Sequence, residues 1–411
     1  MGAAILSEAL AATDASDSTS ARSCSDGAST PNAAQNSSIQ VVASTTPMLQ
    51  RAPPLRDGPD GPAPPPSRAP EPNVGHRYNR HRAREPLAWQ DRNVFPPIEP
   101  YDCGHLDVGD GQSVYWEAVG TPGGIPAVWL HGGPGSPPNA GTRRSFDPAR
   151  WNAVFFDQRG CGRSRPLVSE PGADLTTNTT DHLVRDIERL RVHLGIDRWV
   201  VVGGSWGVTV ALVYAERHPG QVLGLVLGAV TSGRLRETQW VTRDMGRLFP
   251  REWDEFVGFL PEDERGGDLA AAYARRLASP DPAVQEEAAL RWCTWEDTHM
   301  SLAPGAGPRL QLRDPQWRLV FARLVTHYWG HGCFLPDGEV LANVHRIAQL
   351  PAVLVHGRHD VSGPLDTAWE LHKRWPASRL VIVDDAGHFG GSMNDELDAA
   401  IADMADLVRL P

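Results

Sequence analysis

The sequence predicts an α/β protein in which helices cover both faces of a mostly parallel sheet and a helical cap is inserted into the chain. Over residues 91–233, short apolar segments typical of buried strands alternate with segments of helical spacing. The alternation stops at residues 234–334, where the pattern is helical and rich in Trp, Arg and Ala. It resumes over residues 335–411. We therefore expect one core built from two stretches of chain, with the cap between them.

Residues 1–90 have a different composition, rich first in Ala, Ser, Thr and Asn and then in Pro and Arg. Such a segment cannot bury enough apolar surface to offset the entropy lost on ordering its backbone. We expect a disordered tail. It has neither a positively charged start nor a convincing apolar core, so a secretory signal peptide is disfavoured and a cytoplasmic location is expected.

The overall composition excludes several classes of function. The formal net charge is −11, and no basic stripe stands out in the globular part, which argues against a nucleic-acid partner. No apolar run approaches the roughly 20 residues needed to span a bilayer, and no metal-ligand spacing is present. The sequence does not set the oligomeric state. Five widely spaced cysteines without a C-x-x-C pair are typical of reduced thiols: Cys24, Cys103, Cys161, Cys293 and Cys333.

The predicted elements follow from hydrophobic periodicity. Ordered structure is expected to begin near residue 94, and residues 104–108 and 113–119 alternate like two antiparallel strands joined by the turn at 109–111. The other predicted strands are 126–130, 152–157, 199–202, 222–227, 351–356 and 380–384, and clear helices are predicted at 181–194 and 395–410.

One serine stands at the tip of a predicted strand–turn–helix unit. The strand at 199–202 is followed by Gly-Gly-Ser-Trp-Gly at residues 203–207, and residues 208–214 read as a helix. This fits the pattern G-x-S-x-G, in which small residues are needed because strand and helix come close at the turn. The turn lifts Oγ of Ser205 above the sheet edge at the positive end of a helix. Taken alone, the pattern also fits a glycine-rich turn with a capping serine.

A serine is a weak nucleophile at neutral pH, so it needs a general base, and the base needs an orienting acid. In sheets of this type the partners follow the serine in the order acid, then histidine. Asp360 and His388 each lie just past the carboxyl end of a predicted strand, the edge where sites form in open α/β sheets. We therefore predict the triad Ser205, Asp360 and His388. Less favoured candidates on the same two loops are His356, His359, Asp384 and Asp385.

Attack by this serine would place negative charge on a carbonyl oxygen, which must meet preset donors. The expected donors are the backbone N–H of Trp206, directly after the nucleophile, and that of Gly133. Gly133 lies in the sequence His-Gly-Gly-Pro-Gly at residues 131–135, after a predicted strand. A glycine-rich loop can also bind phosphate, but no Lys-Ser or Lys-Thr follows, which excludes a P-loop.

Several motifs together carry a resemblance to a known family. They are Ile98-Glu99-Pro100-Tyr101, His131 to Gly135, Asp157-Gln158-Arg159-Gly160-Cys161-Gly162-Arg163-Ser164, Asn178-Thr179-Thr180, Gly203 to Gly207, His356 to Asp360 and Gly387-His388. Over residues 94–411 the chain resembles the proline iminopeptidase family of α/β-hydrolases, a group of serine peptidases. The resemblance implies an α/β-hydrolase core with a helical cap, release of an amino-terminal proline from small peptides, and no metal or organic cofactor.

The resemblance also implies which cap residues bind substrate. The family pattern Trp-x-x-Trp-Glu recurs at residues 292–296, so Glu296 would pair with the substrate ammonium, with Trp295 and Tyr328 beside it. A second family glutamate, two residues before a His-Tyr pair, is replaced by Val325. A buried amine needs compensating charge, and Asp297 or another cap acid is a candidate to supply it.

Three hypotheses follow from these residues. The first is a serine aminopeptidase that releases an amino-terminal proline or a similar small residue through an acyl-enzyme on Ser205. The second is an esterase or amidase with the same machinery that acts on an uncharged acyl compound. The third is a hydrolase fold used mainly to bind a ligand, which an intact triad disfavours.

Overall fold

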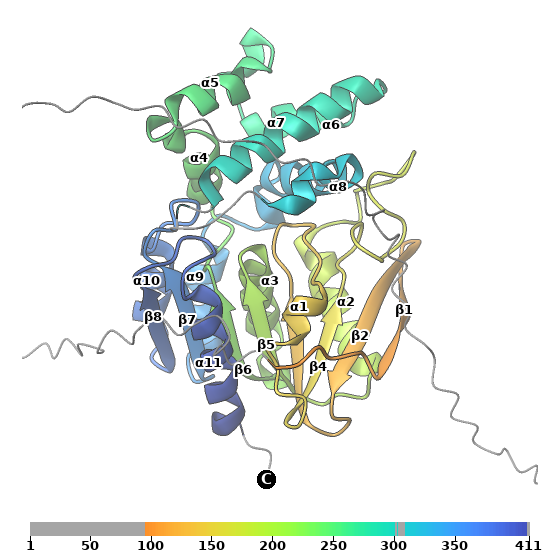
Figure 1. The fold of residues 1–411 in the computed structure, drawn as a ribbon, viewed down its shortest axis with the longest axis vertical. Helices are drawn as coiled ribbons and strands as arrows, with labels where there is room; N and C mark the ends of the chain where they lie inside the picture. Colours follow the sequence, from red (N-terminus) through yellow and green to blue (C-terminus); the bar gives the residue numbers. More distant parts are fainter. Residues whose placement is uncertain (1–94, 301, 303–308, 409–411) are drawn as a thin grey trace, which may run out of the picture. The chain divides into compact units, whose positions relative to one another are not determined.

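The computed structural model describes residues 95–300, 302 and 309–408. All eight predicted strands are present in one sheet of order β1-β2-β4-β3-β5-β6-β7-β8 (Figure 1). Their bounds are β1 Asp102–Gly109, β2 Gln112–Gly120, β3 Ile125–Leu130, β4 Trp151–Phe156, β5 Trp199–Gly204, β6 Val222–Gly228, β7 Ala352–Gly357 and β8 Ser378–Val383. The predicted disordered tail lies outside the described residues.

The sheet is antiparallel at one edge and parallel elsewhere. β1 pairs with β2, and β2 pairs with β4, in antiparallel register, as predicted for the first two strands. The pairs from β4 through β3, β5, β6 and β7 to β8 are all parallel. The inner parallel strands β5, β6 and β7 are apolar and almost entirely buried, which is typical of strands covered on both faces.

Alternate side chains of these strands point to two separate apolar clusters. On β5, Val201 packs in one cluster, and its neighbours Val200 and Val202 pack in the other. The first cluster includes α2, α3, α9 and α10, and the second includes α11. The helices are α1 Ala140–Arg143, α2 Thr180–His193, α3 Trp206–Arg217, α9 Glu339–Asn343, α10 Asp366–Arg374 and α11 Met393–Leu407. The helices predicted at 181–194 and 395–410 correspond to α2 and α11.

Between β6 and β7, the part of the chain from α4 to α8 consists of helices joined by loops, with no strand among its described residues, and it lies above the carboxyl edge of the sheet (Figure 1). We call it the cap. Its apolar interior is a third cluster, distinct from the two that cover the sheet, and it includes Phe256, Trp292 and Phe321. The α-helices of the cap are α4 Leu235–Thr242, α5 Pro250–Gly258, α6 Leu269–Leu277, α7 Pro282–Met300 and α8 Pro315–Trp329.

The prediction that every cysteine is a reduced thiol is wrong at one described position. Cys161, Cys293 and Cys333 are free and buried. Cys103 on the edge strand β1, by contrast, is disulfide-bonded. Cysteine number and spacing could not reveal this, because pairing depends on which segments meet in space.

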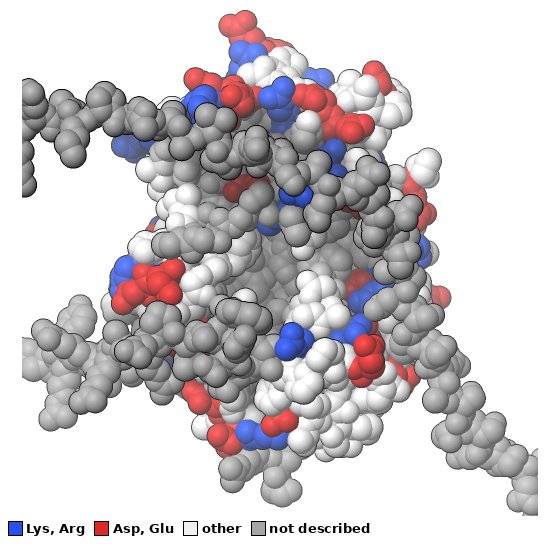
Figure 2. Space-filling view, in the orientation of Figure 1, with Lys and Arg blue, Asp and Glu red and all other residues white. Residues whose placement is uncertain are grey.

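Charged side chains of both signs are interspersed on the face shown in Figure 2, and the described blue residues form no continuous stripe there. Within the described ranges, no helix has both the length and the apolar content needed to cross a bilayer. The same residues contain no group of three or more His, Cys, Asp or Glu side chains arranged to hold a metal ion.

Candidate active site

Ser205 occupies a strained turn between β5 and α3. Its backbone has φ 53° and ψ −123°, a left-handed conformation that costs free energy for any residue with a side chain. Three hydrogen bonds hold the turn in place. The N–H of Ser205 donates to Gly228 O (2.9 Å), and its carbonyl accepts from Thr231 Oγ1 (2.9 Å) and from Val208 N (2.8 Å). The side chain forms no helix cap, so Oγ is left for chemistry.

Two glycines of the motif are required by close packing around this turn. A Cβ on Gly203 would lie 2.7 Å from Gly207 O, and a Cβ on Gly207 would collide with the carbonyl oxygen of Leu130 on β3. Gly204 differs, because a Cβ there meets no atom within 4 Å. The backbone of α3 therefore approaches β3 so closely that only glycine fits at position 207.

The three predicted triad residues meet at the carboxyl edge of the sheet. His388 Nε2 lies 3.0 Å from Ser205 Oγ, and His388 Nδ1 lies 2.8 Å from Asp360 Oδ2. Asp360 follows β7 and His388 follows β8, so two different loops bring acid and base to the serine. The geometry is that of a Ser-His-Asp catalytic triad, in which Nδ1 of the histidine donates to the carboxylate and Nε2 accepts the serine proton.

The surroundings of Asp360 keep it ionised although it is buried. Burial alone would raise the pKa of Asp360, but the charge and the hydrogen bond of His388 hold that pKa below its ordinary value. Gly363 N donates to Asp360 Oδ1 at 2.8 Å. His356 lies next to Asp360. Its Nε2 donates to Gly363 O (2.7 Å) and lies 3.6 Å from Asp360 Oδ2. Burial lowers the pKa of His356, which therefore supports the carboxylate as a neutral ring.

The other less favoured candidates lie apart from the serine. Asp384 is exposed and pairs with Arg358 at 2.5 Å. Asp385 accepts from the N–H and the hydroxyl of Ser392 and shapes the loop that carries His388. His359 is exposed. Within the described residues, none of these three side chains has a hydrogen bond to the triad.

The two expected oxyanion donors, Gly133 and Trp206, line the same cavity as Ser205. Trp206 is the first residue of α3, so its N–H has no acceptor within the helix. Gly133 has φ +108°, and a Cβ there would lie 2.6 Å from Gly135 N, so the loop requires glycine. Within the part of the chain that the structure describes, no acceptor occupies either N–H. Both groups are available to a developing oxyanion.

Gln158 ties these two donors together, a role that motif reading did not assign. Its side chain donates to His131 O (2.9 Å) and accepts from the indole Nε1 of Trp206 (3.1 Å). Its backbone N–H donates to His131 Nε2 (3.0 Å). One amide thus fixes the loop that bears Gly133 against the turn that bears Ser205.

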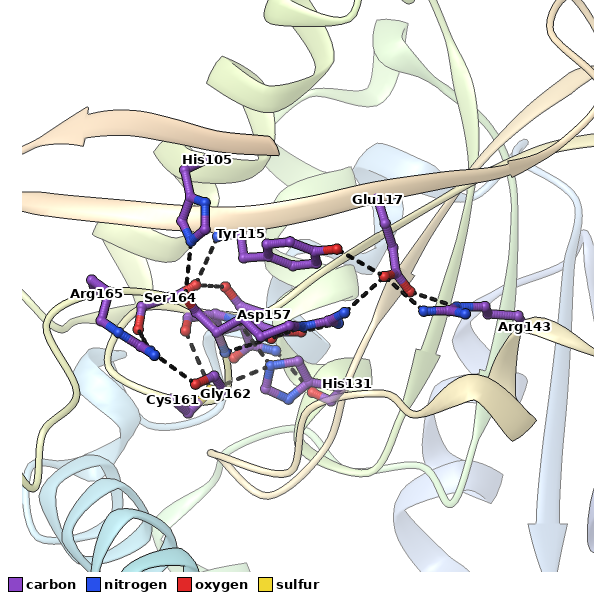
Figure 3. Close-up of polar contacts among 12 residues, drawn as sticks. His105, Tyr115, Glu117, His131, Arg143, Asp157, Cys161, Gly162, Ser164 and Arg165 are labelled. Carbon is purple, nitrogen blue, oxygen red and sulfur yellow. Dashed lines mark hydrogen bonds and ion pairs between the residues drawn. The ribbon is translucent and has the colours of Figure 1, made fainter. Parts of the chain in front are cut away.

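A buried ionic network anchors the loop after β4, which carries Gln158 (Figure 3). Asp157 accepts from the backbone N–H and the guanidinium of Arg163 (2.8 and 2.9 Å). Arg163 also donates to Glu117 (2.8 Å), which in turn receives two bonds from Arg143 (2.8 and 2.9 Å). Burial raises the pKa of Glu117, yet these two arginines hold it below its ordinary value. The conspicuous Asp-Gln-Arg-Gly-Cys-Gly-Arg-Ser sequence is therefore a scaffold for the site.

A cavity of about 470 Å³ lies over Ser205, between the sheet edge and the cap. Its lining is mostly apolar and includes Trp317, Phe321 and Trp329 of the cap. Glu296 on α7 also lines it and is 4 % exposed. Burial raises the pKa of Glu296 against the opposing charge of Arg309. Burying an ionised carboxylate in such a wall costs free energy unless a cation binds beside it.

The predicted substrate contacts of Trp295 and Tyr328 are not supported, because neither side chain is among the cavity lining. Trp295 is packed in the cap interior, where its Nε1 donates to Val241 O (3.1 Å). Tyr328 packs against Trp206, with ring centroids 4.6 Å apart, and its hydroxyl donates to Asn178 Oδ1 (2.5 Å). Both residues support the walls of the site.

Val325 and Asp297 also differ from expectation. Val325 is fully buried in the cap interior and does not line the cavity. Position 325 is therefore not part of the cavity wall in this chain. Asp297 pairs with Arg309 at 3.3 Å and is likewise not among the lining residues. Asp297 is therefore already committed to an arginine.

Several polar residues of the cavity wall were not predicted, and two of them, His299 and Ser362, are hydrogen-bonded to each other. His299 stands three positions after Glu296 on α7, and that spacing places both on one helix face. Helical periodicity from Glu296 could have identified it. Ser362, in the loop after Asp360, carries no comparable signal in the sequence.

The arrangement can perform acyl transfer. It has a nucleophile that lines the cavity, a base 3.0 Å from it, an orienting carboxylate, and two free N–H groups beside the serine. The apolar cavity excludes water from the acyl group, and the carboxylate of Glu296 provides one charged contact away from the serine.

Comparison with known proteins agrees with this geometry. A sequence model of the alpha/beta hydrolase fold matches residues 126–392. A probable proline iminopeptidase of Streptomyces coelicolor is 51% identical over 315 residues, which cover 76% of this chain and 97% of that protein. The proline iminopeptidase of Arabidopsis thaliana is 44% identical over 299 residues, 72% of this chain and 77% of the relative.

Solved structures agree on the fold. The crystal structure of the proline iminopeptidase of Mycobacterium smegmatis aligns with a TM-score of 0.50 at 20% sequence identity, over 75% of this chain and 97% of that one. At that identity the alignment supports the architecture of the sheet and the cap, and the identity of the site rests on the residues described above.

Proposed function

This chain belongs to the proline iminopeptidase family of the α/β-hydrolases, and we propose that it is a serine aminopeptidase that releases an amino-terminal proline from small peptides. The observation that carries the proposal is a buried carboxylate, Glu296, in the wall of a mostly apolar cavity that also holds Ser205 and His388. An amino-terminal ammonium is the cation that such a wall would bind beside a scissile amide.

The reaction follows from the positions of the groups. Ser205 Oγ attacks the carbonyl carbon of the first residue while His388 Nε2 takes its proton. The oxyanion accepts from the N–H groups of Gly133 and Trp206. His388 then gives the proton to the departing amine, leaving proline esterified to Ser205. Water, deprotonated by His388, attacks this acyl-enzyme and releases free proline.

Glu296 sets which substrates enter productively. Its Oε1 accepts from the indole of Trp292 at 2.9 Å, which leaves Oε2 for a ligand. An esterase for uncharged acyl compounds would gain nothing from this carboxylate and would bear the cost of burying it. The aminopeptidase hypothesis is therefore preferred to the esterase or amidase hypothesis.

We expect Glu296→Gln to lower kcat/KM for proline 4-nitroanilide by about 100-fold or more, because the variant leaves a buried ammonium without its counter-charge. Turnover of 4-nitrophenyl acetate, which has no amine, should fall at least tenfold less. Both rates are measured on the same preparations, with Glu287→Gln as a matched control. Glu287 lies on the same helix but is only half-buried and pairs with Arg291 at 2.7 Å.

The two substrates separate the alternatives. Equal activity of the Glu296→Gln variant and the wild type on the prolyl amide would contradict the role of Glu296. A wild-type enzyme that prefers the simple ester and ignores the prolyl amide would favour the esterase alternative.

A cytoplasmic location is part of the proposal. The free thiols of Cys161, Cys293 and Cys333 support it, whereas the disulfide bond of Cys103 counts against it, because disulfides persist mainly in oxidising compartments.

A further inference from the structure

The cavity wall holds a polar atom that the mechanism above does not use, Nε2 of His299. The side chain lines the cavity, and the residue is only 2 % exposed. Among the described residues, Nε2 has no hydrogen-bond partner. An unpaired polar atom in a buried wall costs free energy, so its retention beside a substrate cavity suggests that a ligand supplies the partner.

The hydrogen bonds around His299 define what this atom can accept. Ser362 Oγ donates to the backbone carbonyl of His299 (2.9 Å), so its oxygen is an acceptor for His299 Nδ1–H (2.8 Å). Because the ring proton is on Nδ1, Nε2 carries a lone pair. Burial, with the charges of His388 and Arg309, lowers the pKa of His299 to about 3, so the ring is neutral at physiological pH. Nε2 is therefore a fixed acceptor that needs an N–H or O–H donor.

Glu296 and His299 present their acceptors from one face of α7. They are three residues apart on this helix, so their side chains are neighbours, and both line the cavity. Helix α7 thus presents two acceptors to the cavity, one charged at Glu296 Oε2 and one neutral at His299 Nε2.

We propose that His299 is a specificity-determining residue whose Nε2 accepts one N–H of the substrate's terminal amine while Glu296 accepts the other. This inference rests on the proposed function. A protonated amino-terminal proline is a secondary ammonium and carries two N–H groups, which these two acceptors satisfy. A primary ammonium carries three, and its third would be left unpaired in an apolar wall.

Two other carboxylates near the cavity, Asp297 and Glu237, do not compete for this role. Asp297 pairs with Arg309, and Glu237 accepts from the N–H groups of Ser232 and Gly233. The charges around the bound amine would also balance. The Asp297–Arg309 pair is neutral overall, so the single negative charge of Glu296 matches the single positive charge of the amine. A neutral second acceptor completes the hydrogen bonding without adding a second buried charge.

Two substitutions separate this role from a purely structural one. In His299→Asn, the amide nitrogen takes the place of Nδ1 and keeps the bond to Ser362, but no atom replaces Nε2. In His299→Gln, the amide oxygen takes the place of Nε2 as an acceptor, but the bond to Ser362 is lost. A structural role favours Asn over Gln, and a ligand-binding role favours Gln over Asn.

The variants are assayed in the full-length chain with proline 4-nitroanilide and with 4-nitrophenyl acetate. We expect His299→Asn to lower kcat/KM for the prolyl amide by about 10- to 100-fold, mainly by raising KM. A hydrogen bond to a charged group contributes about this much to binding. The loss should exceed its loss on the ester at least tenfold. His299→Gln should recover most of the prolyl activity.

Each other outcome overturns the inference. If His299→Asn matches the wild type on the prolyl amide and His299→Gln is impaired on both substrates, the residue is structural. If both variants lose the two activities in parallel, the ring supports the fold of the site and not the amine. If the wild-type enzyme hydrolyses the ester but not the prolyl amide, the proposed function itself fails, a result distinct from the first two.

Discussion

Replacing Asp360 by Asn is expected to lower kcat/KM for proline 4-nitroanilide by about 10⁴-fold, the loss that the same exchange causes in another serine triad. The structure supplies the reason. Gly363 N donates to Oδ1 of Asp360 at 2.8 Å, so an asparagine at this position keeps its oxygen on that side. Its NH₂ group then faces Nδ1 of His388, which must become an acceptor and place the ring proton on Nε2. In that tautomer His388 cannot take the proton of Ser205.

The matched control is Asp384→Asn, since Asp384 is an aspartate at the end of the neighbouring strand β8 that is exposed and paired with Arg358. Its activity should stay within about twofold of the wild type, because a surface ion pair contributes little. An Asp360→Asn variant that keeps a tenth or more of the wild-type kcat/KM would contradict the assigned role of Asp360.

Gly207→Ala should be among the most damaging single-methyl changes in the core. The new Cβ would collide with Leu130 O and lie 2.7 Å from Leu130 C, both in the backbone of β3, which cannot move aside like a side chain. Overpacking against backbone costs about 3 kcal/mol or more. We expect the midpoint of thermal unfolding to fall by roughly 5–10 °C, measured by calorimetry or circular dichroism.

Gly204→Ala provides the comparison, since it adds the same methyl group three residues earlier, where no atom lies within 4 Å. Its unfolding midpoint should change by no more than about 2 °C. Equal unfolding midpoints for the Gly207→Ala and Gly204→Ala variants would show that α3 and β3 are not packed as closely as described.

The sequence predicts the core of this protein well because two strong local signals agree. Apolar β-branched runs such as residues 200–202 mark buried strands, and each strand is found where the pattern places it. The triad is predictable for a related reason. Chain order and strand ends restrict where an acid and a base can meet Ser205, and Asp360 and His388 satisfy both conditions.

The substrate-facing residues of the cap are harder to predict from the sequence. On a helix, the direction in which the side chain points changes by about 100° from one residue to the next. Trp295 and Glu296 are adjacent in sequence, yet the first lies in the cap interior and the second lines the cavity. A family motif identifies the segment but not which of its side chains reach the substrate. Helical periodicity from Glu296 leads to His299, but the orientation of its ring depends on a hydrogen bond to Ser362, which a distant loop supplies.

The scaffold around the oxyanion loop shows another limit. The motif at residues 157–164 is conspicuous in the sequence, but only the structure reveals that Gln158 joins His131 to Trp206. Such hydrogen bonds join segments that are far apart in the chain. No local pattern records them.

The central claim is that Ser205 is the nucleophile for the prolyl amide, and labelling with a fluorophosphonate tests it most directly. The folded protein is treated with increasing amounts of the probe, and the residual turnover of proline 4-nitroanilide is compared with the modified fraction determined by mass spectrometry. The account predicts one adduct per chain, located on Ser205, with activity lost in proportion and no labelling of Ser205→Ala. Full prolyl activity in protein labelled at Ser205, or no labelling of the folded wild type, would contradict it.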